Sequence, residues 1–351
     1  VIESSGNPRD KGGEIERGDA LLGYGQVQRA RGAPDDARPA LQAFLECCAG
    51  EGGAADAARM ELALVEFGDD HFEQAMTLAK AVSGGSDPTL RDDGAYWEAK
   101  SMLRLGRDRE AAAALDAALH EYDESELAPT MAYDLGVARW RAGDREDAAR
   151  AFAQFRRAYA GHELAPAALH AEATLALEAG KYADARRLAR SFLRTHSEDA
   201  LAPDVRFIAG EAAYLEGDYA EAAGAFRQVL EDAGTARADR ARYRLGMSLF
   251  RLGRAEEARA ALEDVVGQGA ASGAYRPALA ALGDMAFERG DWVEAERWFD
   301  RFLRGGEGQG EADGSDAALL KLGLALARQE RHAEALARFD AVVAEEATEE
   351  I

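Results

Sequence analysis

The stretch APDVRFIAGEAAYLEGDYAEAAGAFRQVL, residues 202–230, predicts two α-helices joined by a sharp turn. In each half, apolar or small residues recur at steps of three and four residues, which is the spacing of one helix face. Gly217 interrupts this pattern and suits the positive φ found just past a helix end. Asp218 follows it as a candidate cap for the next helix. The stretch therefore predicts a helical hairpin.

The hairpin pattern occurs nine times along the chain. In each copy a Gly or Ala of the first helix is followed, twelve residues later, by an Ala of the second helix, and the copies recur every 36 to 40 residues. A large apolar residue often stands four positions after that Ala. The best-formed copies supply the following residues: Gly136, Ala148, Phe152, Gly210, Ala222, Phe226, Gly246, Ala258, Gly283, Ala295 and Phe299. A fixed period of this length predicts stacked copies of one unit, in which small residues let helices approach closely.

The composition is acidic. The 351 residues carry a formal net charge of −23, with 65 Asp and Glu against 42 Lys and Arg. Nucleic-acid binding requires a surplus of cations on one face, so this charge disfavours it, and anionic membrane surfaces are repelled for the same reason. The acidity suits solubility or a salty habitat, and it could also attract a basic partner. No apolar run approaches the roughly 20 residues that a membrane-spanning helix needs.

No residue pattern indicates catalysis, a cofactor or a metal site. His162-Glu163 would begin a zinc-binding HExxH motif only with histidine at position 166, which is Pro166. The six histidines form no ligand cluster with cysteine, and no glycine-rich loop has the spacing of a nucleotide-binding motif. We therefore expect a non-enzymatic protein without a cofactor or a metal.

The pattern resembles the tetratricopeptide repeat, whose signature combines a small residue in the first helix, Gly at the turn, Ala in the second helix and a following aromatic. The resemblance covers residues 18–346. It implies an all-α fold, a right-handed α-solenoid of about nine helical hairpins, whose concave groove binds a segment of another protein. The period is about three residues longer than the family's usual repeat of about 34. Leu, Ala or Arg also replaces the family's large early aromatic.

These two departures resemble the repeats of bacterial cell-envelope proteins, such as the periplasmic factor of the Tol-Pal system and lipoproteins of outer-membrane protein assembly. The narrower resemblance implies a periplasmic or cell-envelope location. The cytoplasm is the alternative.

Three segments depart from the repeat. Residues 1–17 predict a flexible lead-in or the remnant of an upstream segment. Residues 304–315 are rich in glycine and predict a loop insertion before the last copy, and residues 347–351 predict an acidic tail. In the last copy, Glu330 stands where the turn glycine is expected.

A row of ring-bearing residues is a candidate binding surface. Three positions before the small residue of five successive first helices stand the members of this aromatic row: Tyr96, Tyr133, His170, Phe207 and Tyr243. The family resemblance implies that this position faces the concave groove, where aromatic side chains are favoured anchors. Trp97 stands beside the row and would add to the same surface. The alternative is that the rings pack between adjacent first helices.

A second row occupies the position eight residues further along the first helices. It contains Arg104, Arg141, Arg251 and Arg328, and it is interrupted by Glu178, Leu215 and Glu288. Arginine near a helix C-terminus is favoured by the helix dipole, so a helix-end role is one interpretation. The other is that these side chains hold a carboxylate of the partner. The Lys/Asn/Arg clamp with which co-chaperone members of the family hold a C-terminal carboxylate is not recognisable at the matching positions.

Together, these patterns predict an interaction scaffold that binds a peptide or protein segment within a cell-envelope complex. The acidity allows for a basic partner, and self-association is a further option for a repeat array. The alternatives are a cytoplasmic adaptor or regulatory module, and the recruiting arm of a larger enzyme.

Overall fold

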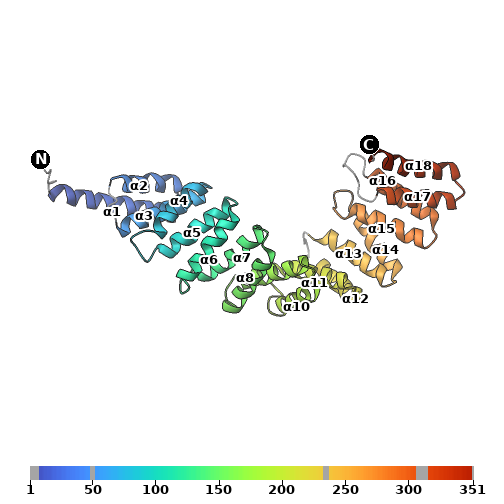
Figure 1. Cartoon of the computed structure of the whole chain (residues 1–351), viewed down its shortest axis with the longest axis horizontal. Helices are drawn as coiled ribbons and strands as arrows, with labels where there is room; N and C mark the ends of the chain where they lie inside the picture. Colours follow the sequence, from blue (N-terminus) through green and yellow to red (C-terminus); the bar gives the residue numbers. More distant parts are fainter. Residues whose placement is uncertain (1–7, 48–51, 232–236, 306–314, 350–351) are drawn as a thin grey trace. The chain divides into compact units, whose positions relative to one another are not determined.

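A computed structural model describes residues 8–47, 52–231, 237–305 and 315–349 of the chain. These described residues form 18 α-helices and no β-strand (Figure 1). In chain order the helices pair as hairpins, each with an odd-numbered first helix and an even-numbered second helix. The first four hairpins are α1 (Pro8–Ala30), α2 (Pro34–Cys47), α3 (Gly53–Gly68), α4 (Phe72–Ser83), α5 (Arg91–Arg104), α6 (Asp108–Glu121), α7 (Ala128–Arg141) and α8 (Arg145–Ala158). The remaining ones are α9 (Ala165–Glu178), α10 (Tyr182–Thr195), α11 (Ala202–Glu216), α12 (Tyr219–Glu231), α13 (Ala238–Arg251), α14 (Ala255–Gly267), α15 (Tyr275–Glu288), α16 (Trp292–Arg304), α17 (Ser315–Arg328) and α18 (His332–Glu349).

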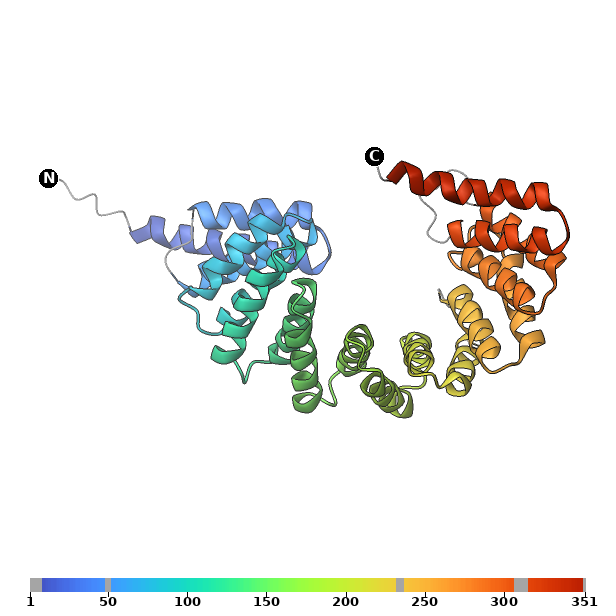
Figure 2. The same cartoon turned by 45° about the vertical axis from the view of Figure 1, so that its right-hand side comes forward.

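The chain divides into two compact units, Val1–Glu172 and Ala173–Ile351, with the boundary inside α9. Within the first unit each helix from α1 to α8 packs on the next, and within the second unit the same holds from α10 to α18 (Figure 2). First helices of successive hairpins also contact one another, as α3 contacts α5 and α13 contacts α15. Each unit is therefore an all-α array of helical hairpins, and its first helices together form one face, called the first-helix face below.

Every turn inside a hairpin uses a residue with positive φ. Gly217 has a φ of 87° between α11 and α12, and glycine occupies the same place in most other hairpins. Asp70 and Glu330 take this conformation with a φ of 63° each. The turn therefore persists in the two hairpins that lack the glycine, although a side chain is disfavoured there.

A close contact joins the two helices of a hairpin. A Cβ atom on Gly210 would lie 2.8 Å from a ring carbon of Phe226, and one on Gly283 would lie 2.6 Å from a ring carbon of Phe299. Gly136 has the same relation to Phe152, and Gly246 to Leu262. The second-helix alanines are completely buried beside these contacts: Ala148, Ala222, Ala258 and Ala295. These residues form the core of each array, which in the second unit is one continuous cluster from Phe207 to Ala335.

The segments outside the regular repeat fall partly within the described residues. Helix α1 begins at Pro8, so residues 8–17 of the predicted lead-in are helical, and residues 1–7 lie outside the described residues. Helix α16 ends at Arg304 and α17 begins at Ser315, at the two edges of the predicted loop, whose residues 306–314 are not described. Helix α18 continues to Glu349, into the predicted tail. Among the helices of the described ranges, none combines the length and the apolar character that a membrane-spanning segment needs.

Candidate partner-binding surface

The aromatic row lies along five first helices, and its members differ in burial. Phe207 and Tyr96 are buried, with 2% and 7% of their surface exposed. Tyr133, His170 and Tyr243 are half-buried. Burial raises the pKa of the Tyr133 and Tyr243 hydroxyls, so both stay neutral at physiological pH. Only the half-buried members therefore offer much side-chain surface to a partner.

Two rings of the aromatic row pack within their own hairpins. The ring centre of Tyr133 lies 5.6 Å from that of Phe152 and 6.0 Å from that of Phe155. The ring centre of Phe207 lies 5.5 Å from that of Phe226. Both rings thus contact the second helix of their own hairpin. The alternative from the sequence is instead packing between adjacent first helices. For Phe207, nearly complete burial favours a packing role.

Tyr96 and Trp97 connect neighbouring hairpins of the first unit. The ring of Trp97 lies 5.0 Å from that of Phe67 on α3, the preceding first helix. The Tyr96 hydroxyl donates a hydrogen bond of 3.3 Å to Asp134 on α7, the following first helix. Both residues therefore help to hold successive first helices together.

Ion pairs join successive first helices at one repeated position. Lys100 Nζ lies 2.6 Å from Asp134 Oδ2, and Lys321 Nζ lies 2.6 Å from Asp284 Oδ1. Arg244 donates two hydrogen bonds to Glu211, of 2.6 and 2.9 Å. In each pair, one residue directly follows the small residue of its helix, and the other stands two positions before the small residue of the next hairpin. Sequence reasoning missed these pairs. Their signal in the sequence is an opposite charge 33 to 37 residues away, which many other charged residues also have.

The arginine row links each hairpin to the one before it. Each of its members is the last residue of a first helix and reaches the first residue of the preceding second helix. The Arg104 guanidinium lies 4.3 Å from the ring centre of Phe72, and Arg141 lies 3.1 Å from the carboxylate of Asp108. Arg251 donates a hydrogen bond of 2.9 Å to the hydroxyl of Tyr219. Arg328 lies 5.7 Å from the ring centre of Trp292. The row therefore occupies helix ends, and its partners include rings and carboxylates of the chain itself.

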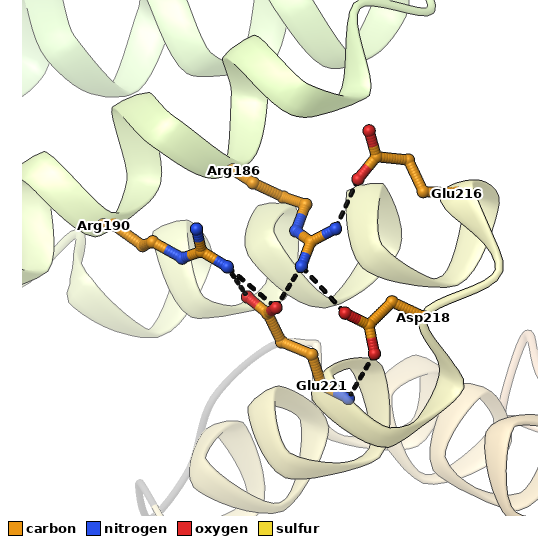
Figure 3. Close-up of polar contacts among 5 residues, drawn as sticks. All are labelled: Arg186, Arg190, Glu216, Asp218 and Glu221. Carbon is orange, nitrogen blue, oxygen red and sulfur yellow. Dashed lines mark hydrogen bonds and ion pairs between the residues drawn. The ribbon is translucent and has the colours of Figure 1, made fainter.

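A denser charge cluster joins α10 to the α11–α12 hairpin (Figure 3). Arg186 contacts Glu216, Asp218 and Glu221, with 2.9 Å between its Nη2 and Asp218 Oδ2. Arg190 adds contacts of 2.7 and 2.8 Å to the carboxylate of Glu221. Asp218 accepts the backbone N–H of Glu221 at 3.1 Å, so it caps α12 as the sequence indicates. This N–H and the Arg186 guanidinium lower the pKa of Asp218, which keeps the carboxylate charged.

The contact between Arg186 and Asp218 has counterparts in other hairpins. Arg186 directly follows the second-helix alanine of its hairpin. Asp218 stands four residues before the next such alanine. At the same two positions, Glu296 Oε2 lies 2.6 Å from Arg331 Nη1, and Met76 Sδ lies 3.3 Å from Arg107 Nη1. The contact therefore recurs with different chemistry, and in one case with the signs of the charges exchanged.

Two pockets open on the first-helix face of the second unit. One has a volume of about 560 Å³ and lies between α13 and α15, where its lining includes Arg240, Tyr243 and Arg244. The other has a volume of about 280 Å³ and lies between α15 and α17. Its lining includes Arg276 and Lys321 of these first helices, and Phe299 and Phe302 of α16. Pro277 lines both pockets, so they adjoin. Tyr243 is the member of the aromatic row that this arrangement brings into a pocket. No group of three or more His, Cys, Asp or Glu residues in the described ranges is placed to hold a metal ion.

Comparison with known families identifies the repeat. A model of the tetratricopeptide repeat matches residues 96–163, 170–238, 217–275 and 243–314, and a second model of the same repeat matches residues 317–347. Together these matches cover more than half of the chain. No curated protein matches the chain in sequence.

Three solved structures with similar folds are matched over most of their own length. A tetratricopeptide repeat protein from Parabacteroides merdae is 15% identical, with a TM-score of 0.50 over 78% of this chain and 100% of its own. BtubC (BKLC) from P. vanneervenii is 16% identical, with a TM-score of 0.50 over 59% of this chain and 90% of its own. PilF from Pseudomonas aeruginosa is 18% identical, with a TM-score of 0.46 over 64% of this chain and 95% of its own. At identities of 15% and 16%, the likeness to the first two structures concerns the fold alone.

Proposed function

Because the chain belongs to the tetratricopeptide repeat family, we propose that its first-helix face binds a segment of a partner protein. Proteins of this family generally mediate protein–protein interactions. The observation that carries the proposal is the pair of adjoining pockets on this face of the second unit, one of which Tyr243 lines. A half-buried tyrosine beside a pocket is a favourable anchor, because its ring adds contact area with little conformational freedom to lose.

Rigid presentation of the binding residues is the proposed mechanism. Tyr243 is packed against the core cluster, and Arg244 beside it is fixed by its two hydrogen bonds to Glu211. Side chains that are already ordered lose little entropy when a partner binds, so most of the ordering cost falls on the partner segment. In the first unit, Tyr133, Trp97 and the half-exposed Arg104 and Arg141 are the corresponding candidates. Arg251 extends the proposed surface in the second unit.

We propose a scaffold role without catalysis, within a bacterial cell-envelope complex. The scaffold role follows from the family, whose fold generally serves as a non-enzymatic interaction module. The envelope context rests on the long period and the missing early aromatic of the repeats. Fractionation of the source cells, with an antibody against the intact gene product, tests the location. Recovery in the cytoplasmic fraction would instead support the adaptor or regulatory module.

Site-specific photo-crosslinking tests the binding face. A photoreactive phenylalanine analogue replaces Tyr243 in one variant and Tyr182 in another, and each is irradiated in a lysate of the source cells. Tyr182 is a suitable control because it is half-buried in the same unit but begins a second helix. We expect a defined crosslinked protein from position 243 and none from position 182. Equal labelling at both positions, or labelling at 182 alone, would contradict binding at the first-helix face.

A further inference from the structure

The two pockets of the second unit have an excess of positive charge, although the whole chain carries −23. Four cations line them: Arg240, Arg244, Arg276 and Lys321. Asp239 and Asp284 are the two carboxylates among the lining residues. Charges at the protein surface are screened over about 8 Å at physiological salt, so a bound segment responds to these local charges more than to the distant acidic ones.

Pairing within the chain already neutralises several of these charges. Arg244 is bound by both carboxylate oxygens of Glu211, and Lys321 is bound by Asp284. Asp239 lies 3.2 Å from Arg242, outside the pocket lining. Arg240 lies near the same Glu211 carboxylate but forms no hydrogen bond with it, so Arg240 and Arg276, one in each pocket, are the cations without a hydrogen-bonded carboxylate.

Arg240 and Arg276 are held so that their donors remain available. The Arg240 guanidinium lies 5.2 Å from the ring centre of Phe207, and its side chain is 59% exposed. Its distance to the buried carboxylate of Glu211 is 3.8 Å, longer than a hydrogen bond. The Arg276 guanidinium lies 4.5 Å from the ring centre of Phe302, and it forms no ion pair with any described residue. A guanidinium that lies over a ring can still direct N–H groups to a carboxylate, because it carries five N–H donors.

Apolar surface separates the two cations. The exposed ring of Pro277 is shared by both pockets, with Ala274 and Tyr243 on one side of it and Ala280 and Ala318 on the other. An extended peptide presents alternate side chains to one face. Such a peptide could place an apolar side chain near Pro277 and a carboxylate in each flanking pocket.

We propose that this part of the first-helix face binds an extended protein segment in which acidic side chains flank an apolar one, with Arg240 and Arg276 as the carboxylate-binding residues. The inference rests on the proposed function and specifies the chemistry of the partner. It assigns an acidic partner segment to this surface, in place of the basic partner that the net charge alone favours. Charge complementarity is the reason, because a paired carboxylate and guanidinium form a charge-assisted, bidentate contact.

Selection from a random-peptide library displayed on phage, with the full-length chain as the target, tests the proposal. Each displayed peptide is fused at its C-terminus, so only side-chain carboxylates can satisfy the arginines. We expect the selected peptides to be enriched in Asp and Glu around an apolar residue. We also expect the double substitution Arg240→Glu with Arg276→Glu to weaken binding of a selected peptide by at least about tenfold. Fluorescence anisotropy measures the change, and raising the salt concentration should weaken the wild-type complex.

A matched double substitution controls for net charge. Arg227→Glu with Arg304→Glu changes the charge equally on α12 and α16, where both side chains are exposed and neither lines a pocket. This control should leave the affinity nearly unchanged. If the Glu variant loses its helical circular dichroism, Arg240→Gln with Arg276→Gln replaces it and should also weaken binding.

The outcomes separate the two proposals. Selection of basic or uncharged peptides, or equal loss in the control, would overturn the acidic-segment inference and leave peptide binding by this face intact. Selected peptides that do not compete with one another and crosslink to second helices would contradict the proposed binding face itself.

Discussion

The ring of Phe226 occupies the space in which a side chain of Gly210 would otherwise lie. The gap of 2.8 Å between a Cβ at position 210 and the ring is shorter than real Cβ atoms show. Helices α11 and α12 can therefore approach only because residue 210 has no side chain. Copies with Ala in the first helix have a smaller or more flexible residue opposite: Ala63 with Ala79, Ala99 with Leu115, and Ala173 with Ala189. The phenylalanines at this second-helix position therefore all face glycine, whereas leucine faces glycine in some copies, such as Gly246 with Leu262, and alanine in another.

Gly210→Ala should destabilise the protein. Alanine usually stabilises a helix interior by about 0.5–1 kcal/mol relative to glycine, but overpacking costs about 1–3 kcal/mol, so we expect a net loss. Adding Phe226→Leu should recover part of it, because the ring that obstructs the new methyl group is gone. Urea denaturation followed by circular dichroism measures the free energy of unfolding.

Gly224→Ala is the matched control. Gly224 lies inside α12, and a Cβ there would meet nothing within 4 Å. This substitution should raise the free energy of unfolding by about 0.5–1 kcal/mol. If Gly224→Ala and Gly210→Ala had the same sign of effect, the contact with Phe226 would not be the cause.

Arg186→Met should lower the free energy of unfolding by about 1–2 kcal/mol, because it leaves Glu216, Asp218 and Glu221 together with fewer cations. The Arg186 side chain is 15% exposed, and its partners are 29–42% exposed, so solvent screens part of the interaction. Arg187→Met removes the same charge from the next residue of α10, where the side chain is 64% exposed and pairs with Asp184. A change below about 0.5 kcal/mol is expected there. Equal losses in the two variants would refute a special role for the cluster.

Asp56 gives a prediction for the pH dependence of stability. Its buried carboxylate accepts backbone N–H groups of Ser86 and Asp87, at 2.7 and 2.9 Å, and so fixes the turn between α4 and α5. Burial raises the pKa of Asp56, but these hydrogen bonds outweigh burial and bring the pKa below its ordinary value. The unfolded-state pKa is about 3.9. The contribution of this group to stability is therefore complete above that pH and is lost as the pH falls through the lower folded-state pKa.

Asp56→Asn should accordingly destabilise the protein at neutral pH by about 1–3 kcal/mol, and the difference from wild type should shrink as the pH falls to about 3. Asp116→Asn is the control, because that carboxylate is 60% exposed and pairs with Arg139. Free energies of unfolding of the three proteins over this pH range provide the test. A difference for Asp56→Asn that grows toward low pH would show that the carboxylate is not needed in its charged form.

Glu330→Gly should raise the free energy of unfolding by about 0.5–1 kcal/mol. Residue 330 has a φ of 63°, and glycine adopts this conformation without the strain that a Cβ atom causes. Glu330→Gln removes the same charge while it keeps the Cβ atom, so it should leave stability nearly unchanged. Thermal unfolding of the full chain measures both. A gain of equal size in both variants would assign the effect to charge.

The hairpin array could be predicted from the sequence because the same residue types recur at a fixed spacing in every copy. Gly217 and Phe226 have roles that depend on their immediate helices, so a local pattern identifies them. The burial of Phe207 was harder to anticipate, because its position on the helix lies near the line of contact with the second helix. Whether such a ring faces a partner or the core depends on a rotation of the helix that periodicity does not specify.

Contacts between hairpins were largely beyond sequence reasoning. Arg186 and Asp218 are 32 residues apart, and many charged residues have an opposite charge at a similar distance. The register that brings these two together depends on how the hairpins stack. Arg251 illustrates the same limit, since its position at a helix end was foreseen but its contact with Tyr219 was not.

The exchange of sign between Arg186–Asp218 and Glu296–Arg331 makes the order of the copies matter. If unequal recombination removed the α11–α12 hairpin, Arg254 would take the place of Asp218, because it stands four residues before Ala258. The guanidinium groups of Arg186 and Arg254 would then lie close together at the new junction and repel each other. A gene built from repeated modules can lose one of them, and a mismatched junction of this kind would destabilise the shortened product.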